Sequence, residues 1–195
     1  VEEVTTLRPL VTLGFGSQIE KSALKGSKLE DITDYARAKM RAREIFEASI
    51  EQSSLVGKWI YIFSVYGEGM DSGWILPKLI DAHKNGSLVS MGACLQRWGF
   101  LHVSDFCRAI DLILSRPSDF PFTIDIGDEA ARSLRDLVHE VEKILGSQCA
   151  TFSNSATLVP DSIPDLRPLK SAGWSQHVTF EQGLEELKDS YARND

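Results

Sequence analysis

The run at residues 58–66, Lys-Trp-Ile-Tyr-Ile-Phe-Ser-Val-Tyr, most constrains what this chain can fold into. It is almost continuously apolar, β-branched and aromatic, whereas a strand with one face in water alternates between apolar and polar residues. The run therefore predicts one long strand that is covered on both faces and ends at Gly67. Such strands are typical of parallel sheets flanked by helices.

Apolar runs and amphipathic stretches alternate along the rest of the chain. Further strands are expected at 10–13, 88–91, 100–103 and 122–126. Helices are expected at about 34–52, 74–85, 106–114, 134–145 and 180–191. This alternation predicts βα units, and so an α/β fold with a mostly parallel sheet. The short elements after residue 68 indicate a smaller second lobe, with a ligand cleft between that lobe and the sheet.

Residues that favour helix ends support these ranges. Thr33 or Asp34 can cap the 34–52 helix, and Ser104 or Asp105 can cap the 106–114 helix. The sequence at 133–136, Ser-Leu-Arg-Asp, resembles a capping box. The helix stops are Gly86 and Gly146. The segment 147–171 is rich in Ser and Pro, so we expect a partly ordered loop with one short strand.

The composition narrows the classes of partner. A net charge of -7 gives no basic field for nucleic acid or an anionic membrane, so a bound phosphate must be held by a few placed residues. No apolar run is long enough to span a membrane, and the N-terminus lacks the pattern of a signal peptide.

The cysteines Cys94, Cys107 and Cys149 form no C-x-x-C unit, and we interpret them as reduced thiols of a cytosolic protein. The four histidines lack metal-ligand spacing, so no metal site is expected.

Tyr35 and Lys39 are the first candidates for chemistry. Four residues apart on the expected helix, they lie one above the other on the same face. An ammonium beside a phenol favours the phenolate, which makes the pair usable for proton transfer near neutral pH. The same Y-x-x-x-K spacing also occurs by chance in amphipathic helices, so the pair alone does not establish a catalytic site.

Ser17 is the second candidate. It follows Gly14-Phe15-Gly16, which we interpret as a turn at the end of the 10–13 strand. Loops at the carboxyl ends of strands are where open α/β sheets hold their ligands. Ser17 is therefore either a catalytic hydroxyl or a turn serine that caps the next backbone N–H. The nearby glycines form neither a G-x-G-x-x-G fingerprint nor a phosphate loop.

The order of the motifs resembles that of the extended short-chain dehydrogenase/reductase family, and most of all its NAD-dependent epimerase/dehydratase branch, which works on nucleotide sugars. After the strand ending in Gly-Ser and the Y-x-x-x-K pair come Phe-Ser-Val-Tyr-Gly at 63–67, Arg-Trp-x-Phe-Leu-His-Val-x-Asp at 97–105, Ile-x-Ile-Gly at 124–127, Ala-Gly-Trp at 172–174 and Glu-Gln-Gly-Leu at 181–184. The resemblance covers residues 10–190. It implies a partial Rossmann-like parallel sheet with helices on its faces, its catalytic part in residues 1–67, and a small α+β substrate lobe mainly in residues 68–195.

The resemblance also implies roles for individual residues. Tyr35 would be the acid/base that moves the proton of a sugar hydroxyl as hydride moves to or from a nicotinamide. Lys39 would favour the phenolate of Tyr35 and hydrogen-bond the nicotinamide ribose, and Ser17 would orient the substrate oxygen. The implied cofactor is NAD or NADP, and the choice between them stays open.

Three further residues follow from the same resemblance. Ser64 and Val65 match positions that pack against the nicotinamide and the substrate. Arg97 matches an arginine that binds the nucleotide diphosphate, for which a planar guanidinium fork is well suited. A salt bridge between the lobe and the sheet is the alternative role for Arg97.

The sequence departs from the family pattern in three ways. The glycine-rich dinucleotide loop and the acidic ribose-binding residue, which precede this region in the family, are absent from the 195 residues, and we expect the sequence to begin within a longer protein. The Asp-Glu pair of the 4,6-dehydratases is replaced by Gln18-Ile19-Glu20, which disfavours water elimination. Tyr61 stands where many members have an arginine.

Two hypotheses follow. The first is an NAD(P)-dependent nucleotide-sugar epimerase or 4-keto-sugar reductase in the cytoplasm, with a possible homodimer through the Tyr35 helix. The alternative is a non-catalytic fragment or subunit of such an enzyme that lacks the cofactor cradle. A flavodoxin-like binding domain without chemistry would not explain the ordered motifs.

Overall fold

The computed structural model describes residues 10–17, 21, 33–130, 132–154 and 160–193. The chain divides into two compact units. Unit 1 comprises residues 1–62, 109–126 and 165–174, and unit 2 comprises residues 63–108, 127–164 and 175–195. Unit 1 holds a parallel sheet, and unit 2 holds three pairs of short strands with most of the shorter helices.

The sheet of unit 1 confirms the predicted α/β fold. It contains β1 (Val11–Ser17), β2 (Val56–Ile62) and β7 (Thr123–Ile126) in the order β1-β2-β7, and both pairings are parallel. The five central residues of β2 are buried, as expected for a strand that is covered on both faces.

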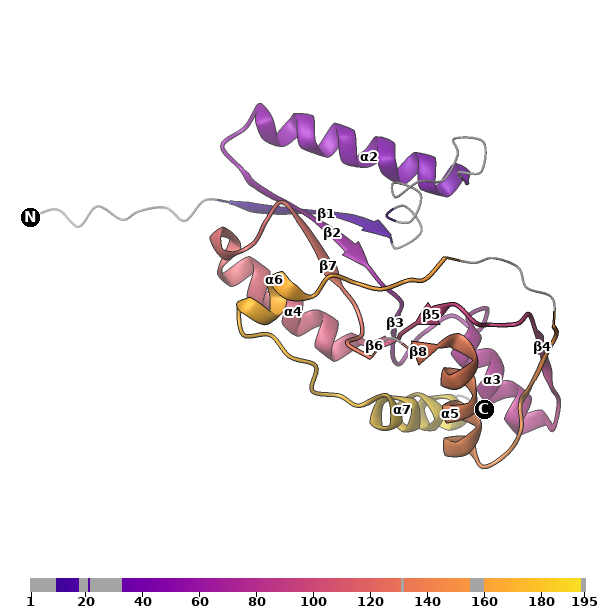
Figure 1. The fold of residues 1–195 in the computed structure, drawn as a ribbon. Helices are drawn as coiled ribbons and strands as arrows, with labels where there is room; N and C mark the ends of the chain where they lie inside the picture. The colour runs from indigo at the N-terminus through magenta and orange to yellow at the C-terminus, as the bar shows by residue number, and fades with distance from the viewer. Residues whose placement is uncertain (1–9, 18–20, 22–32, 131, 155–159, 194–195) are drawn as a thin grey trace, which may run out of the picture. The chain divides into compact units, whose positions relative to one another are not determined.

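Helix α2 (Asp34–Glu51) runs along one face of this sheet (Figure 1). It begins as predicted, because Thr33 is the N-cap and its hydroxyl accepts a hydrogen bond from the backbone N–H of Ala36. Phe46 anchors the helix on the sheet, with its ring centroid 5.6 Å from that of Trp59 on β2. Unit 1 also contains a 3₁₀ turn at Pro117–Asp119 and α6 (Arg167–Ser171), a helix that the sequence analysis did not predict.

The turn predicted at Gly14–Ser17 is wrong, because these residues continue strand β1. Gly14 pairs with Trp59 of β2, and a Cβ added at Gly14 would clash with the Trp59 indole. The glycine is therefore present to admit a large neighbour, and it does not mark a change of chain direction.

The single strand predicted at residues 58–66 is two strands. Strand β2 ends at Ile62, and β3 (Val65–Tyr66) pairs in parallel with β6 (Leu101–His102) in unit 2. The apolar pattern continues through the break, where Phe63 and Tyr66 are buried and Ile62 and Val65 are half-buried. Hydropathy alone therefore does not reveal where the strand changes its partner.

Unit 2 is built around helices α3 (Ile75–Asn85), α5 (Leu134–Leu145) and α7 (Phe180–Arg193), which gather in the lower part of Figure 1. Its core is aliphatic and aromatic, and its fully buried members include Tyr66, Leu76, Leu79, Ile80, Leu137, Val141, Leu184 and Leu187. The remaining strand pairs are β4 (Val89–Met91) with β9 (Ala150–Phe152), which is parallel, and β5 (Arg97–Trp98) with β8 (Arg132–Ser133), which is antiparallel. Gly86 and Gly146 end α3 and α5 in the left-handed conformation, as predicted.

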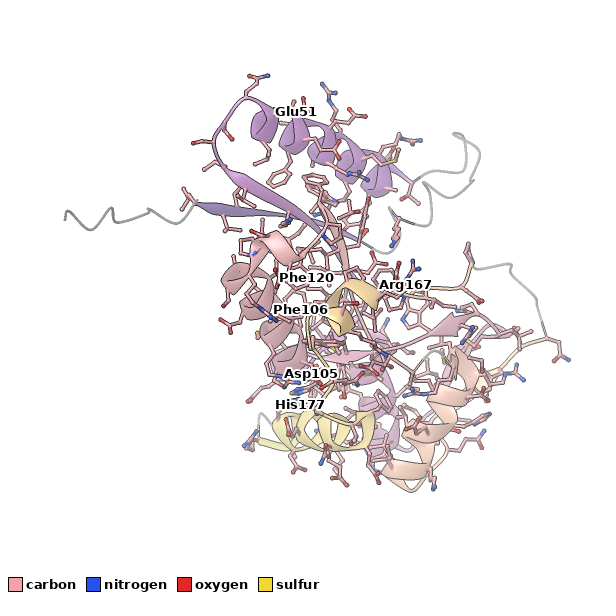
Figure 2. The ribbon with its side chains drawn as sticks, turned by 60° about the vertical axis from the view of Figure 1, so that its left-hand side comes forward. Glu51, Asp105, Phe106, Phe120, Arg167 and His177 are labelled. Atoms are coloured by element: carbon pink, nitrogen blue, oxygen red, sulfur yellow. The ribbon has the colours of Figure 1, made fainter. Side chains whose placement is uncertain are left out.

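Helix α4 (Val103–Ser115) begins earlier than predicted, so Ser104 and Asp105 lie within its first turn and do not cap it. The Asp105 carboxylate instead accepts the backbone N–H groups of His177 and Val178, at 3.2 and 3.0 Å. Figure 2 labels Asp105 and His177 in this arrangement, ahead of α7. In the sequence, an aspartate whose buried carboxylate fixes a distant loop cannot be distinguished from an aspartate that caps a helix.

Within the ranges that the structure describes, no helix is both long enough and apolar enough to cross a bilayer.

Candidate active site

Lys39 connects the candidate residues of unit 1. Its ammonium donates a hydrogen bond to the carbonyl oxygen of Phe15, at 3.1 Å, near the carboxyl end of β1. The same nitrogen lies 5.8 Å from the centroid of the Tyr35 ring, one helical turn earlier in α2. The helix spacing predicted this face, and the contact with β1 adds a second fixed point for the cation.

Tyr35 and Ser17 occupy positions from which they can reach a ligand. Tyr35 is the second residue of α2 and is 52% exposed. Ser17 is the last residue of β1, is half-buried, and lies in register with Ile62 at the end of β2. A phenol and an ammonium on one helix face can transfer a proton to or from a bound alcohol or carbonyl group, and a hydroxyl at the carboxyl end of a parallel strand can orient such a group.

A cation cluster around Tyr61 was missed by the sequence analysis, which noted only that Tyr61 replaces an arginine. Tyr61 is buried, and its hydroxyl accepts a hydrogen bond of 2.7 Å from the Arg43 guanidinium. The ammonium of Lys21 lies 5.4 Å from the Tyr61 ring centroid and forms an ion pair with buried Asp125. Two cations, those of Lys21 and Arg43, thus lie near the Tyr61 ring.

The remaining predicted residues belong to unit 2. Ser64 lies between β2 and β3, and its hydroxyl accepts a hydrogen bond of 2.8 Å from the Trp98 indole. Val65 begins β3 and pairs with Leu101. Arg97 is an exposed residue of β5, and its backbone N–H donates to a carboxylate oxygen of Asp161 at 2.7 Å.

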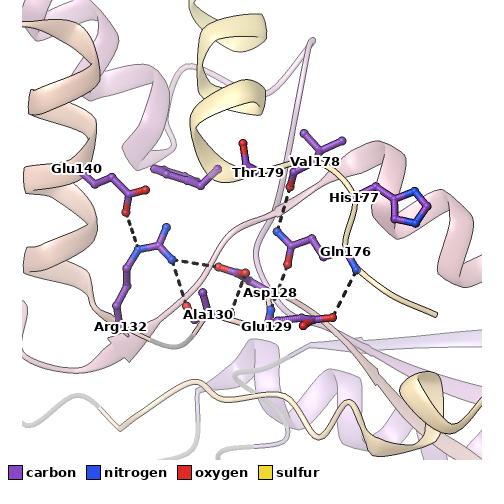
Figure 3. A pocket seen from close by; sticks show the side chains of 10 residues that line it. Asp128, Glu129, Ala130, Arg132, Glu140, Gln176, His177, Val178 and Thr179 are labelled. Atoms are coloured by element: carbon purple, nitrogen blue, oxygen red, sulfur yellow. Dashed lines mark hydrogen bonds and ion pairs between the residues drawn. The ribbon is translucent and has the colours of Figure 1, made fainter. Parts of the chain in front are cut away.

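A pocket of about 350 Å³ lies between the loop after β7 and the segment before α7 in unit 2 (Figure 3). Arg132 lies at its wall, 2.9 Å from a carboxylate oxygen of Glu140 and 3.6 Å from one of Asp128. The guanidinium carbon of Arg132 is 5.0 Å from the Phe180 ring centroid. Burial raises the pKa of Asp128. Because Arg132 faces two carboxylates and a ring of its own chain, we interpret these contacts as joining the loop to α7.

Comparisons with known proteins identify a matching sequence family and solved structures of similar fold. The sequence model of the NAD dependent epimerase/dehydratase family matches residues 13–127. A UDP-glucuronic acid 4-epimerase mutant from Bacillus cereus, in complex with UDP-4-deoxy-4-fluoro-glucuronic acid and NAD, is similar in fold, with a TM-score of 0.80 and 18% identity over 95% of this chain and 62% of that chain. A UDP-N-acetylglucosamine 4-epimerase from Methanobrevibacter ruminantium, in complex with UDP-N-acetylmuramic acid, has a TM-score of 0.76 and 19% identity over 95% of this chain and 64% of that chain.

A third similar structure is an NAD-dependent NDP-hexosamine 5,6-dehydratase involved in tunicamycin biosynthesis, with a TM-score of 0.77 and 16% identity over 95% of this chain and 64% of that chain. The chain thus spans 62–64% of the length of these three structures. At this level of identity the likeness concerns the fold, and it confirms a Rossmann-like α/β architecture.

Proposed function

Because the chain belongs to the NAD-dependent epimerase/dehydratase family, we propose that it carries the proton-transfer residues of a nucleotide-sugar epimerase or 4-keto-sugar reductase. The observation that carries the proposal is the position of Lys39, whose ammonium bonds the carbonyl oxygen of Phe15 and lies near the Tyr35 ring. A cation held in this way stabilises negative charge on the Tyr35 oxygen.

In this proposal Tyr35 is the acid/base. Its phenolate oxygen takes the proton of a sugar hydroxyl as that carbon is oxidised, and its phenol returns a proton when the ketone is reduced. Ser17 donates a hydrogen bond to the same sugar oxygen and so orients it toward Tyr35. Lys39 places its ammonium beside the Tyr35 ring and favours the phenolate form.

The residues of unit 1 fit one end of a nicotinamide cofactor. Lys39 and Tyr35 supply donors on one helix face that suit the hydroxyl groups of the nicotinamide ribose. NAD or NADP, when bound, supplies the hydride acceptor and donor. A glycine-rich loop for the pyrophosphate does not occur in the 195 residues, so this chain's own residues account for the nicotinamide end alone.

We place substrate contacts in unit 2. Arg97 is exposed, and its guanidinium fork suits a nucleotide diphosphate. Ser64 and Val65 would contact the nicotinamide and the sugar. Solved structures with the same fold were determined with UDP-glucuronic acid or UDP-N-acetylmuramic acid, which supports a nucleotide sugar as the class of substrate.

The alternative is a non-catalytic fragment or subunit without a cofactor cradle. It is favoured by the lack of a glycine-rich loop and by the place of β1 at one edge of the sheet, among the strands that the structure describes. Titration of the 195-residue chain with NADH, followed by nicotinamide fluorescence, separates the two. Saturable binding supports the enzyme and is followed by a screen of nucleotide sugars for turnover. Absence of binding supports the alternative.

We also propose that α2 forms a homodimer interface. Small and apolar residues spaced three and four apart line one exposed stripe of this helix, namely Ala38, Ala42 and Ile45. This spacing is that of a helix–helix packing seam.

We further propose a cytoplasmic location. It agrees with Cys94, Cys107 and Cys149, all three of which are free thiols.

A further inference from the structure

Trp98 fixes the side chain of Ser64. The indole Nε1–H of Trp98 donates a hydrogen bond to Oγ of Ser64, with 2.8 Å between the heavy atoms. The two residues are 34 positions apart and lie in the same unit. The ordered motifs assign site roles to Ser64 and Arg97 and none to Trp98.

The main chain of Ser64 is held by the same segment. The backbone N–H of Leu101 donates to the carbonyl oxygen of Ser64 at 2.9 Å. Between Trp98 and Leu101 the chain passes Gly99, where an added Cβ would lie 2.7 Å from Cβ of Asp128. The connection is therefore tightly packed, and Trp98 and Leu101 fix Ser64 through its side chain and its backbone.

Strand β5 is itself held from both sides. It pairs with β8, where Trp98 lies opposite Arg132. On the other side, the backbone of Arg97 donates to Asp161 at 2.7 Å and accepts from the N–H of Ser162 at 2.9 Å. Successive side chains of a strand point to opposite faces. Trp98 therefore lies on the face of β5 toward Ser64, and Arg97 leaves the strand on the other face.

We propose that Trp98 is a positioning residue, which holds the Ser64 hydroxyl in the orientation needed to bind the substrate. This inference rests on the proposed function, in which Ser64 contacts the nucleotide sugar or the nicotinamide. An indole N–H can only donate, so the Ser64 oxygen is the acceptor in this contact. Loss of the indole N–H removes a contact that holds the Ser64 side chain in its rotamer.

The test measures binding of UDP-glucuronic acid in the presence of NADH by isothermal titration calorimetry. Trp98→Phe keeps an aromatic ring and removes the N–H, and Ser64→Ala removes the acceptor while leaving the indole in place. Each change weakens binding about three- to tenfold, the loss expected for one neutral hydrogen bond. The double variant binds no more weakly than the weaker of the two single variants, because Trp98 acts through Ser64.

Two matched variants and a spectroscopic measurement complete the design. Trp74→Phe makes the same replacement at a residue that is 61% exposed at the start of α3, and it leaves affinity unchanged. Ser64→Thr keeps the hydroxyl and restores binding. In ¹⁵N NMR spectra, the indole N–H signal of Trp98 is identified as the one that disappears in Trp98→Phe. This N–H exchanges with water more rapidly in Ser64→Ala than in the wild type.

The outcomes separate this inference from the proposed function. In one outcome, the wild type binds UDP-glucuronic acid, and Trp98→Phe and Ser64→Ala bind it equally well but have lower thermal stability. The contact between Trp98 and Ser64 is then purely structural, and this overturns the inference alone. Absence of saturable UDP-glucuronic acid binding by the wild type, together with no turnover of other nucleotide sugars, overturns the proposed function and the inference with it.

Discussion

The ammonium of Lys39 donates a hydrogen bond of 3.1 Å to the carbonyl oxygen of Phe15, two residues before the end of β1. A lysine on a helix surface normally loses considerable side-chain entropy when it is fixed in one geometry. Here the strand carbonyl holds the nitrogen 5.8 Å from the Tyr35 ring centroid. The contact thus fixes the ammonium of Lys39 near the carboxyl end of β1, where Ser17 lies.

Replacement of Tyr35 by Phe tests the acid/base assignment. In the holoenzyme we expect kcat to fall about 10²- to 10⁴-fold, the usual contribution of a positioned proton donor. Affinity for the nucleotide sugar and thermal stability should stay close to the wild type, because the ring is retained and is 52% exposed. Steady-state kinetics and differential scanning calorimetry measure these quantities.

Tyr191→Phe is the matched control for that change. The Tyr191 hydroxyl donates a hydrogen bond of 2.7 Å to the carbonyl oxygen of Met70, within unit 2. Its loss should lower the free energy of unfolding by about 1 kcal/mol and leave kcat unchanged. A Tyr35→Phe enzyme with wild-type kcat would show that the proton comes from another residue.

Gly14→Ala tests the close approach of Trp59 to β1. The new methyl group would clash with the indole of Trp59, which is almost fully buried and has little room to move. We expect the free energy of unfolding to fall by about 1–3 kcal/mol, as for other overpacked cores. Urea denaturation should show a lower midpoint with an unchanged slope. Gly92→Ala is the control, because a Cβ there meets no atom within 4 Å, and an equal loss in both variants would contradict the explanation.

Local patterns predicted those parts of the fold whose cause is local. Thr33 and Ser133 begin helices because their hydroxyl groups accept backbone N–H bonds within the next turn. Gly86 and Gly146 end helices because each adopts a positive φ, of 61° and 79°. Each of these features depends on a few adjacent residues, so the sequence alone contains the signal.

Features that depend on distant partners could not be predicted in the same way. Gly14 resembles a turn glycine until the position of Trp59 is known, and the 58–66 run shows no break where β3 leaves for β6. In the candidate site, the helical spacing predicted the Tyr35–Lys39 face. The contact of Ser64 with Trp98 could not be predicted, because the position of Trp98 depends on the pairing of β5 with β8, two short strands about 35 residues apart.

Asp165 makes the stability of the protein sensitive to acid. Its pKa is lowered from 3.8 to about 2, first because the Arg167 side chain donates hydrogen bonds to its carboxylate, at 2.8 and 2.6 Å. The folded state therefore binds this proton less tightly than the unfolded state. The resulting stabilisation is present above pH 4 and is lost as the pH falls toward 2.

Two measurements check this prediction. NMR titration of the Asp165 carboxyl carbon should give a pKa near 2 in the wild type and a value closer to 3.8 in Arg167→Ala. Asp165→Asn should be less stable than the wild type at pH 6 and closer to it at pH 2, because about half of the wild-type Asp165 carboxylates are then protonated. An unshifted carboxyl signal in the wild type would contradict the bidentate contact with Arg167.

Ile45→Glu tests the proposed homodimer. Ile45 is 55% exposed on the same stripe of α2 as Ala38 and Ala42. A charge placed in a helix seam would be desolvated without a partner, so dimerisation should weaken by at least about tenfold. Multi-angle light scattering over a range of concentrations should give twice the chain mass for the wild type and the chain mass for Ile45→Glu. Leu114→Glu introduces the same charge at a 43% exposed residue of α4 and should remain dimeric. A wild type that stays monomeric at high concentration excludes this interface.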